Sequence, residues 1–322
     1  MINLDINRHM SEKKTMKNKK IVVLQGGHSE EREVSLTSSA QIGTALEEAG
    51  YDVRHIDPID FETLISCIDD VKRHQPLIVF NGLHGGYGED GTIQTIMDCA
   101  SLKYTGSGSK ASMLAMDKHI AKLIAKSLKI PYPKHILLEQ ETDMQTEELI
   151  AEIGLPMVIK PNNSGSSVGV TIVKDESQIE EAIKSAFEYD NVIMCEKYIE
   201  GKELTVSILG KKALPIVEIR PKNGWYDYTN KYSHGKTEYI VPAPLDERRA
   251  IVIQDYALLI YHQLGCQAYV RVDFRYDGNK FYFLELNTLP GMTPLSLTPM
   301  AAKEAGFSFI EMLEEIIACS VQ

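Results

Sequence analysis

The sequence predicts an α/β and α+β protein in which an amino-terminal α/β domain with a parallel sheet precedes two smaller α+β modules. Short apolar runs of strand length alternate with helical patterns along the first third of the chain. Later strands flank a glycine-serine loop or alternate with loops and helical patterns, which is typical of α+β modules. The 322 residues also exceed what one ordinary hydrophobic core organises. We therefore expect several small domains in contact.

Composition excludes some classes of function. The net charge is −11, and no stripe of Lys and Arg occurs after the first twenty residues, which argues against a nucleic-acid partner. No stretch reaches the roughly 18 apolar residues of a membrane span, and the amino terminus lacks the apolar segment of a signal peptide. Five scattered cysteines without a CxxC pair favour buried thiols in a reducing compartment. The expected location is the cytoplasm, without a membrane partner.

The first domain is expected over residues 20–117, after a disordered polar tail at 1–19. An apolar run at 21–24 leads into the glycine pair Gly26-Gly27 and then a helical pattern, which indicates strand, turn and helix. The same alternation continues to a long loop at 81–91. The expected elements are strands 21–24, 51–56 and 77–80, a helix ending at 49 and a helix at 61–72.

The central module is expected over residues 118–201 and the carboxy-terminal module over 202–322. In the central module a glycine-serine loop joins two strands, and a proline pair, Pro131 and Pro133, ends the first helix. Its expected elements are helix 118–128, strands 157–160 and 168–173, helix 176–187 and strand 192–198. Those of the carboxy-terminal module are strand 203–209, helix 246–264, strands 268–276 and 281–286 and helix 307–318.

The last strand pair carries a candidate metal site. Successive strand residues point to opposite faces, so Arg271 and Asp273 share one face, as do Glu285 and Asn287. A three-residue turn at 277–279 would place Arg271 opposite Glu285, and Asp273 opposite Phe283, making Asp273 and Glu285 diagonal neighbours on one surface. A two-residue turn would place the acids on opposite faces. The expectation is that all four polar side chains share one face.

Two carboxylates and one amide oxygen are hard ligands that suit Mg²⁺ beside nucleotide phosphates. The alternative is that these acids simply edge a solvated hairpin. A second candidate is the loop from Lys160 to Gly169, KPNNSGSSVG, whose backbone N–H groups can close over phosphates while Lys160 supplies charge. The alternative for this loop is a flexible connector.

The motifs as a set resemble one family. In order along the chain they read GGHSEEREVS, HGGYGEDG, YTGSG, MDK, VIKPNNSGSSVGV, EKYIEGKEL, YDYTNKY, RVDF and LELNTLPGMTPLSL. This set closely resembles the D-alanine:D-alanine ligases of the ATP-grasp superfamily from Ile21 to nearly the end. The resemblance implies that the two later modules form a two-module ATP-grasp fold. The first and last motifs disfavour an ATP-grasp carboxylase or a purine-pathway ligase.

The resemblance implies an ATP site between the two modules. Lys118 and Lys160 match positions near the phosphates, Ser167 lies in the phosphate loop, and Glu203 matches the position that holds the ribose hydroxyls. The adenine edge would be lined by Glu196, Lys197, Tyr198 and Ile199. Asp273, Glu285 and Asn287 match the ligands of Mg²⁺ (or Mn²⁺), with two ions expected.

The resemblance also implies roles around the two amino-acid substrates. Glu31 matches the acid at the ammonium of the first D-alanine, and His84 the histidine of the same subsite. Ser166 and Tyr232 would hydrogen-bond with Glu31 and hold a lid closed. The remaining matches are Tyr226 and the γ-phosphate lysine Lys231 in the lid, Arg271 and the Gly291 N–H in an oxyanion hole, and Ser296 and Leu297 at the second substrate.

The implied reaction forms a D-alanyl phosphate and ADP, after which the amine of a second D-alanine displaces phosphate, giving a precursor of peptidoglycan. D-lactate or D-serine as second substrate is an alternative: Tyr232 favours D-alanine, but His234 lies only two residues away. A non-catalytic nucleotide or amino-acid sensor is an alternative from another class. The family's habit also suggests a homodimer.

Overall fold

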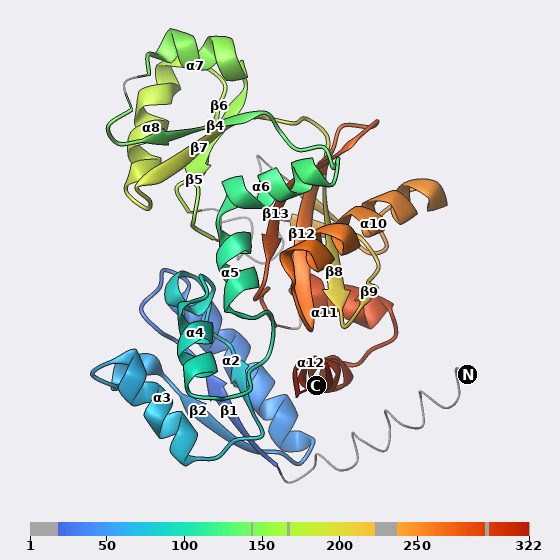
Figure 1. The fold of residues 1–322 in the computed structure, drawn as a ribbon. Helices are drawn as coiled ribbons and strands as arrows, with labels where there is room; N and C mark the ends of the chain where they lie inside the picture. Colours follow the sequence, from blue (N-terminus) through green and yellow to red (C-terminus); the bar gives the residue numbers. More distant parts are fainter. Residues whose placement is uncertain (1–18, 143, 166–167, 223–236, 294–295, 322) are drawn as a thin grey trace.

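The computed structural model describes residues 19–142, 144–165, 168–222, 237–293 and 296–321. These residues form three sheets of three, four and six strands, with helices packed against each (Figure 1). The part of the chain that is described confirms an amino-terminal parallel sheet, and the two sheets that follow it are antiparallel.

The first sheet has the order β2-β1-β3, and both of its pairings are parallel. The middle strand is almost entirely buried because helices cover both of its faces, which explains its continuous apolar run. Helix α2 and the last helix, α12, pack on one face, and α3 and α4 on the other. The bounds are β1 Lys20–Leu24, α2 Arg32–Glu48, β2 Asp52–Ile56, η1 Pro58–Asp60, α3 Leu64–Arg73, β3 Ile78–Asn81, η2 Gly86–Gly88, α4 Thr92–Cys99 and α12 Phe309–Val321.

The second sheet has the order β4-β7-β5-β6, with antiparallel pairings throughout. Helices α7 and α8 cover it and share one apolar cluster with its strands. The bounds are β4 His135–Glu139, α7 Thr146–Ile153, β5 Met157–Pro161, β6 Thr171–Val173, η3 Glu176–Gln178, α8 Ile179–Phe187 and β7 Val192–Lys197. The strand expected from 168 begins only at Thr171, and the helix expected from 176 opens with a 3₁₀ turn.

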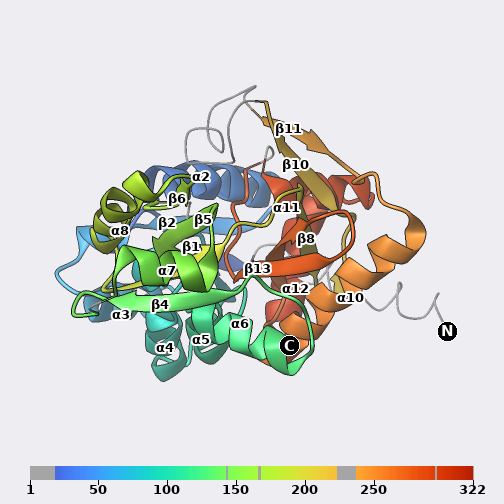
Figure 2. The ribbon, with the colours of Figure 1, turned by 90° about the horizontal axis from the view of Figure 1, so that it is seen from above.

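The third sheet runs β11-β10-β8-β12-β13, with β9 paired to β8. Helices α5, α6 and α10 pack on one face, and α11 and α12 join it to the first sheet through a shared core (Figure 2). The bounds are α5 Ser109–Met116, α6 Lys118–Ser127, β8 Lys202–Leu209, β9 Lys212–Ala213, β10 Val217–Pro221, β11 Thr237–Ile240, α10 Glu247–Leu264, β12 Tyr269–Tyr276, β13 Phe281–Asn287 and α11 Leu297–Glu304. Asp246 caps α10, which ends at Gly265 in a left-handed conformation.

The turn between β12 and β13 differs from the expectation. It has four residues, 277–280, so the expected pairing of Asp273 with Phe283 is wrong. A β-bulge at Leu284 adds one residue to β13, and this addition brings Glu285 directly opposite Asp273 and Asn287 opposite Arg271. The four polar side chains therefore share one face, as expected, but through a different register.

The cysteines follow the expectation only in part. All five are free; Cys67, Cys195 and Cys266 are buried, Cys319 is half-buried, and Cys99 is exposed. Cys99 is the last residue of α4, where the helix meets solvent, which explains the exception. Among the described helices, none combines the length and the apolar character needed to cross a membrane.

Candidate active site

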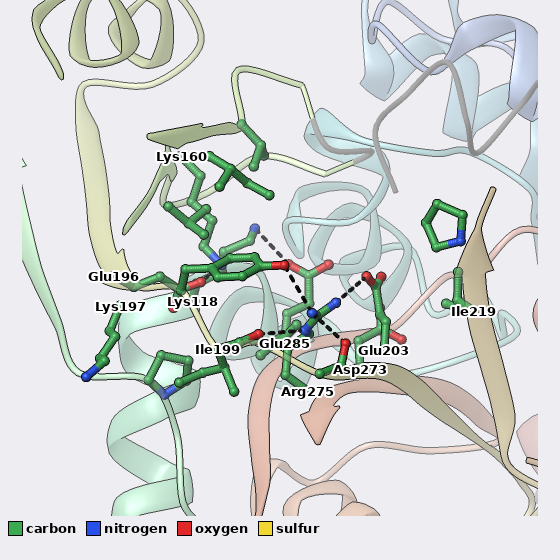
Figure 3. A pocket seen from close by; sticks show the side chains of 18 of the residues that line it. Lys118, Lys160, Glu196, Lys197, Ile199, Glu203, Ile219, Asp273, Arg275 and Glu285 are labelled. Carbon is green, nitrogen blue, oxygen red and sulfur yellow. Dashed lines mark hydrogen bonds and ion pairs between the residues drawn. The ribbon is translucent and has the colours of Figure 1, made fainter. Parts of the chain in front are cut away.

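A cavity of about 450 Å³ lies between the second and third sheets (Figure 3). This volume is in the range of small-molecule sites. Strands β5 and β7 supply one wall, and β8, β10, β12 and β13 supply the other. Charged side chains reach it from both walls, including Lys118, Lys160, Glu203, Asp273 and Glu285.

The candidate metal ligands lie where β12 and β13 face this cavity. Asp273 accepts hydrogen bonds from Arg271 Nε at 2.9 Å and Nη2 at 2.7 Å. Thr205 Oγ1, on the neighbouring strand β8, donates to Asp273 Oδ1 at 2.6 Å. These contacts fix the carboxylate on the cavity side of the sheet, opposite Glu285.

The donor chemistry at this face suits Mg²⁺. Among the described residues no three His, Cys, Asp or Glu side chains gather into a closed cage. The face instead offers two carboxylates and the amide of Asn287, an open set of hard oxygens that leaves positions for water and phosphate. Arg271 and Lys118 now balance the charge of the two acids, at 2.7 Å from Asp273 and 3.5 Å from Glu285.

Lys118 connects the face that carries Glu285 to the loop that contains Ser164. It is the first residue of α6, and Asp117 caps that helix by accepting from Ile120 N. Its ammonium donates to the carbonyl of Ser164 and lies 3.5 Å from Glu285 Oε2. Asn162 fixes the helix start, because its side-chain oxygen accepts from His119 N at 3.0 Å.

Lys160 and Glu196 form part of a buried charge cluster with Lys122. Glu196 pairs with Lys160 and lies 3.1 Å from Lys122, which is fully buried and donates to the carbonyl of Leu284 at 2.7 Å. Burial alone would raise the pKa of Glu196, but the two ammonium groups outweigh it and lower the pKa to about 2. Burial lowers the pKa of Lys122 to about 8, against the attraction of Glu196. At neutral pH the cluster holds two positive charges and one negative charge.

The connection from β7 to β8 forms another part of the cavity wall. Lys197, Tyr198 and Ile199 line it, and Glu203 follows at the start of β8 (Figure 3). Burial is the largest of the effects that raise the pKa of Glu203 to about 7, and the charges of Asp273 and Glu285 act in the same direction. Arg275 lies beside Glu203 and opposes this shift.

Glu31, from the first domain, approaches the loop at 160–169, and His84 lies in the same domain. Both are buried, and His84 Nδ1 lies 3.5 Å from Glu89 Oε1. A methyl group placed on Gly165 would lie 3.0 Å from Glu31 Oε2, so the carboxylate and the loop backbone are in close contact. The structure therefore brings Glu31 against Gly165, a residue that lines the cavity, with His84 beside Glu89 in the same domain.

The predicted second-substrate residues lie at the start of α11. Ser296 Oγ is 2.8 Å from Thr293 Oγ1, and a methyl group on Gly291 would lie 3.1 Å from Ser296 Oγ. Leu297 is buried within the core that joins the first and third sheets. Ser166, Ser167, Tyr226, Lys231 and Tyr232 lie outside the described residues.

Several charged residues at or beside the site escaped the sequence prediction, and Lys122 and Arg275 are two of them. Lys122 was detectable, because it falls among the buried α6 positions Lys118, Ala121 and Ala125, where a lysine is unusual. Arg275 continues the alternation of Arg271 and Asp273 on one face of β12. Its partners lie some 75 residues earlier, at Tyr198, Ile199 and Gly201, so only the folded chain reveals its contacts.

Comparisons with known proteins agree with this arrangement. A family model described as "D-ala D-ala ligase C-terminus" matches residues 124–318. Over 308 residues the chain is 39% identical to a D-alanine–D-alanine ligase of Syntrophotalea carbinolica, covering 95% of this chain and 98% of the relative. A D-alanine–D-alanine ligase of Nitrosospira multiformis is 41% identical over 299 residues, covering 92% and 95%.

Solved structures show the same fold. A D-alanine–D-alanine ligase from Bacillus anthracis superposes with a TM-score of 0.84 at 35% identity, covering 94% of this chain and 97% of that one. The complex of that enzyme with ATP gives 0.80 at 32% identity, covering 94% and 96%. The VanG D-Ala:D-Ser ligase of Enterococcus faecalis gives 0.78 at 31% identity, covering 94% and 99%.

Proposed function

The chain belongs to the D-alanine–D-alanine ligase family, and from this membership we propose that it joins two D-alanine molecules at the expense of ATP for peptidoglycan precursor synthesis. The observation that carries the proposal is the juxtaposition of Asp273, Glu285 and Lys118 in the wall of a cavity that Glu203 and the β7–β8 connection also line. This arrangement fits a nucleoside triphosphate with its phosphates at the metal face.

ATP is proposed to bind with its triphosphate between Lys118 and Lys160. Both lysines are buried and reach the cavity from the side of the phosphate loop. The adenine would lie against Lys197, Tyr198 and Ile199, and the ribose hydroxyls against Glu203. Ser167 would complete the phosphate loop.

Asp273, Glu285 and Asn287 are the proposed ligands of Mg²⁺ or Mn²⁺, and the family resemblance implies two ions. The metal would neutralise the charge that develops on the transferring phosphoryl group. This chain's own contribution is to hold both carboxylates on one face, through Arg271 and Thr205 at Asp273 and through Lys118 at Glu285.

The first step is proposed to be attack of a D-alanine carboxylate on the γ-phosphate, which yields D-alanyl phosphate and ADP. Glu31 would bind the ammonium of this D-alanine, with His84 beside it. The support is the close contact of the Glu31 carboxylate with Gly165 of the phosphate loop, which places the first subsite next to the nucleotide. Ser166, Lys231, Tyr232 and Tyr226 would close this subsite and exclude water from the acyl phosphate.

In the second step the amine of another D-alanine attacks the acyl carbon, and phosphate leaves. Arg271 and the Gly291 N–H are proposed to stabilise the oxyanion that forms. Ser296 would bind the carboxylate of the second D-alanine, and Leu297 would border that subsite. The contact between Gly291 and Ser296 supports a shared location for these two functions.

We propose that residues 20–117 form the substrate domain, residues 118–201 the central module and residues 202–322 the carboxy-terminal module. Cytoplasmic activity is proposed because ATP is available there, and a homodimer is proposed from the family resemblance. Light scattering of the purified chain tests the homodimer.

The test of function is product analysis by mass spectrometry. Purified protein receives ATP, Mg²⁺ and D-alanine alone or with D-serine or D-lactate, between pH 6 and 9. We expect D-alanyl-D-alanine and one ADP per dipeptide. A dominant mixed product at neutral pH would reassign the second substrate, and no ADP release would favour a sensor.

A further inference from the structure

Arg275 occupies a central place in the wall of the cavity without belonging to any of the motifs quoted above. It lies on β12, two residues beyond Asp273 and on the same face of the sheet. Its register partner on β8 is Glu203. Its guanidinium points across β8 toward the connection that links the second sheet to the third (Figure 3).

The guanidinium contacts four residues in the part of the cavity wall that is proposed to hold the adenine and the ribose. Nε donates to the carbonyl of Ile199 at 3.0 Å, and Nη2 donates to the carbonyl of Gly201 at 2.8 Å. Nη2 also lies 3.3 Å from the hydroxyl of Tyr198, whose ring the guanidinium faces at 5.4 Å from its centroid. Nη1 lies 3.3 Å from Glu203 Oε2.

These contacts use the fork geometry of arginine. Three nitrogens serve acceptors in different directions at once, which a single ammonium cannot do. The side chain is only 16% exposed, so the ion pair with Glu203 is largely shielded from solvent. One planar group thus fixes the position of the Tyr198–Gly201 connection relative to the Glu203 carboxylate.

The way Arg275 holds Glu203 leaves part of the carboxylate available. Arg275 engages Oε2, and within the described part of the chain no hydrogen bond occupies Oε1. In the proposed function, on which this inference rests, that carboxylate receives the ribose hydroxyls. A carboxylate held through one oxygen presents the other in a defined direction.

We propose that Arg275 is a positioning residue that sets the selectivity of the site for a ribonucleotide, by orienting Glu203 toward the sugar hydroxyls and by fixing the Tyr198–Gly201 connection. Without Arg275, Glu203 loses its only cationic neighbour within salt-bridge distance among the described residues. Its carboxylate then turns freely, and the advantage of ATP over a deoxynucleotide declines.

The test measures nucleotide affinity rather than turnover. Isothermal titration calorimetry in the presence of Mg²⁺ gives dissociation constants for ATP, 2′-deoxy-ATP and 3′-deoxy-ATP. The wild type is compared with Arg275→Met and Arg275→Lys. Arg249→Met is the matched control, because Arg249 is a half-exposed arginine of α10, outside the residues that line the cavity, and forms a surface ion pair with Asp246.

We expect the wild type and Arg249→Met to bind ATP roughly tenfold or more tightly than at least one deoxynucleotide, since a hydrogen bond to a charged group has about this value. Arg275→Met should bind ATP roughly tenfold more weakly, with the preference falling toward one. Arg275→Lys should keep part of the preference, because it retains the charge beside Glu203. In turnover, the KM for ATP should rise while the KM for D-alanine stays within about twofold.

Equal losses for all three nucleotides, with the wild-type preference intact, would make Arg275 merely structural and overturn the proposal. A wild type without any preference for ATP would overturn it as well. Circular dichroism checks folding, and should Arg275→Met fail to fold, the ratio for Arg275→Lys decides. Dipeptide formation by the wild type is measured in a separate experiment. If the protein binds ATP selectively but forms no dipeptide, the proposed function is refuted and the role of Arg275 is not.

Discussion

Replacing Glu196 by glutamine would leave two buried lysines, Lys122 and Lys160, without a shared counter-charge. Glu196 is 2% exposed, and its carboxylate is the anion between the two ammonium groups. Removing one partner of a buried ion pair costs about 3–5 kcal/mol, because the remaining charge stays desolvated. We therefore expect Glu196→Gln to lower the free energy of unfolding by about 3–5 kcal/mol at pH 7.

The pH dependence gives a second measure of the same effect. The folded-state pKa of Glu196 is about 2, against an ordinary value of 4.5. A carboxyl with a lowered pKa contributes stability that is full above the unfolded value and is lost as the pH falls through the folded value. The contribution amounts to about 3 kcal/mol. The stability difference between wild type and variant should therefore shrink as the pH falls below 4.5.

Lys122→Met provides the contrast. It removes one of the two positive charges and leaves the neutral pair of Lys160 and Glu196. The loss is then chiefly the hydrogen bond that Lys122 donates to the carbonyl of Leu284, about 1–3 kcal/mol for a buried group left without its partner. The expected order of destabilisation is Glu196→Gln above Lys122→Met.

Urea unfolding followed by circular dichroism at pH 7 measures the free energy of unfolding of both variants. The values can be compared if this free energy depends equally steeply on urea concentration in both. Glu200→Gln is the control, since Glu200 is exposed four residues away and should stay within about 0.5 kcal/mol of wild type. The reasoning is refuted if Lys122→Met is the more destabilising variant, or if Glu196→Gln resembles the control.

Three further predictions concern the cavity. Asp273→Asn should lower the rate of ADP release by on the order of a hundredfold and raise the Mg²⁺ concentration needed for half-maximal rate, since it removes the charge beside Arg271; an unchanged Mg²⁺ dependence would contradict the metal assignment. A folded-state pKa of about 7 for Glu203 makes the wild type lose stability as the pH rises from 4.5 to 7. The free energy of unfolding of Glu203→Gln should therefore increase by about 1–3 kcal/mol relative to that of the wild type across this window. A pH-independent difference in urea unfolding would speak against this prediction. Gly165→Ala places a methyl 3.0 Å from Glu31 Oε2 and should raise the KM for D-alanine several times more than the KM for ATP; equal changes would argue against the assigned first subsite.

The parts of the fold that were predicted are those whose pattern is local. The strands at 21–24 and 203–209 are continuous apolar or alternating runs, and the structure has them as β1 and β8 with shifts of one residue. The short helices α4 and α5, the edge strand β11 and its neighbour β10 were not predicted. Each has only four to eight residues, too few for a helical or alternating period to appear above loop composition. Their stability comes from packing against the sheets rather than from local preference.

The candidate site likewise has residues whose placement could be predicted from the local sequence and residues whose placement could not. Residues close in sequence, such as Arg271 with Asp273, could be placed on a common face from strand geometry alone. Contacts that join distant segments could not, because nothing local in Lys122 identifies Glu196, 74 residues later, as its partner. The residues missed by sequence reasoning are thus those whose function depends on the approach of two sheets.

In the β12–β13 hairpin the acids share one face as predicted, although the predicted pairing of Asp273 with Phe283 was wrong. A four-residue turn with regular pairing would have placed Asp273 opposite Leu284 and turned Glu285 to the other face, since a slip of one residue exchanges the two faces of a strand. The bulge at Leu284 restores the common face, and the carbonyl of this extra residue accepts a hydrogen bond from Lys122 at 2.7 Å. A bulge leaves a backbone group without its ladder partner, and here a buried lysine from α6 supplies that partner. Lys122 therefore connects two features that the sequence presents separately: the irregular strand that brings Glu285 opposite Asp273, and the charge cluster that holds Lys160 at the cavity.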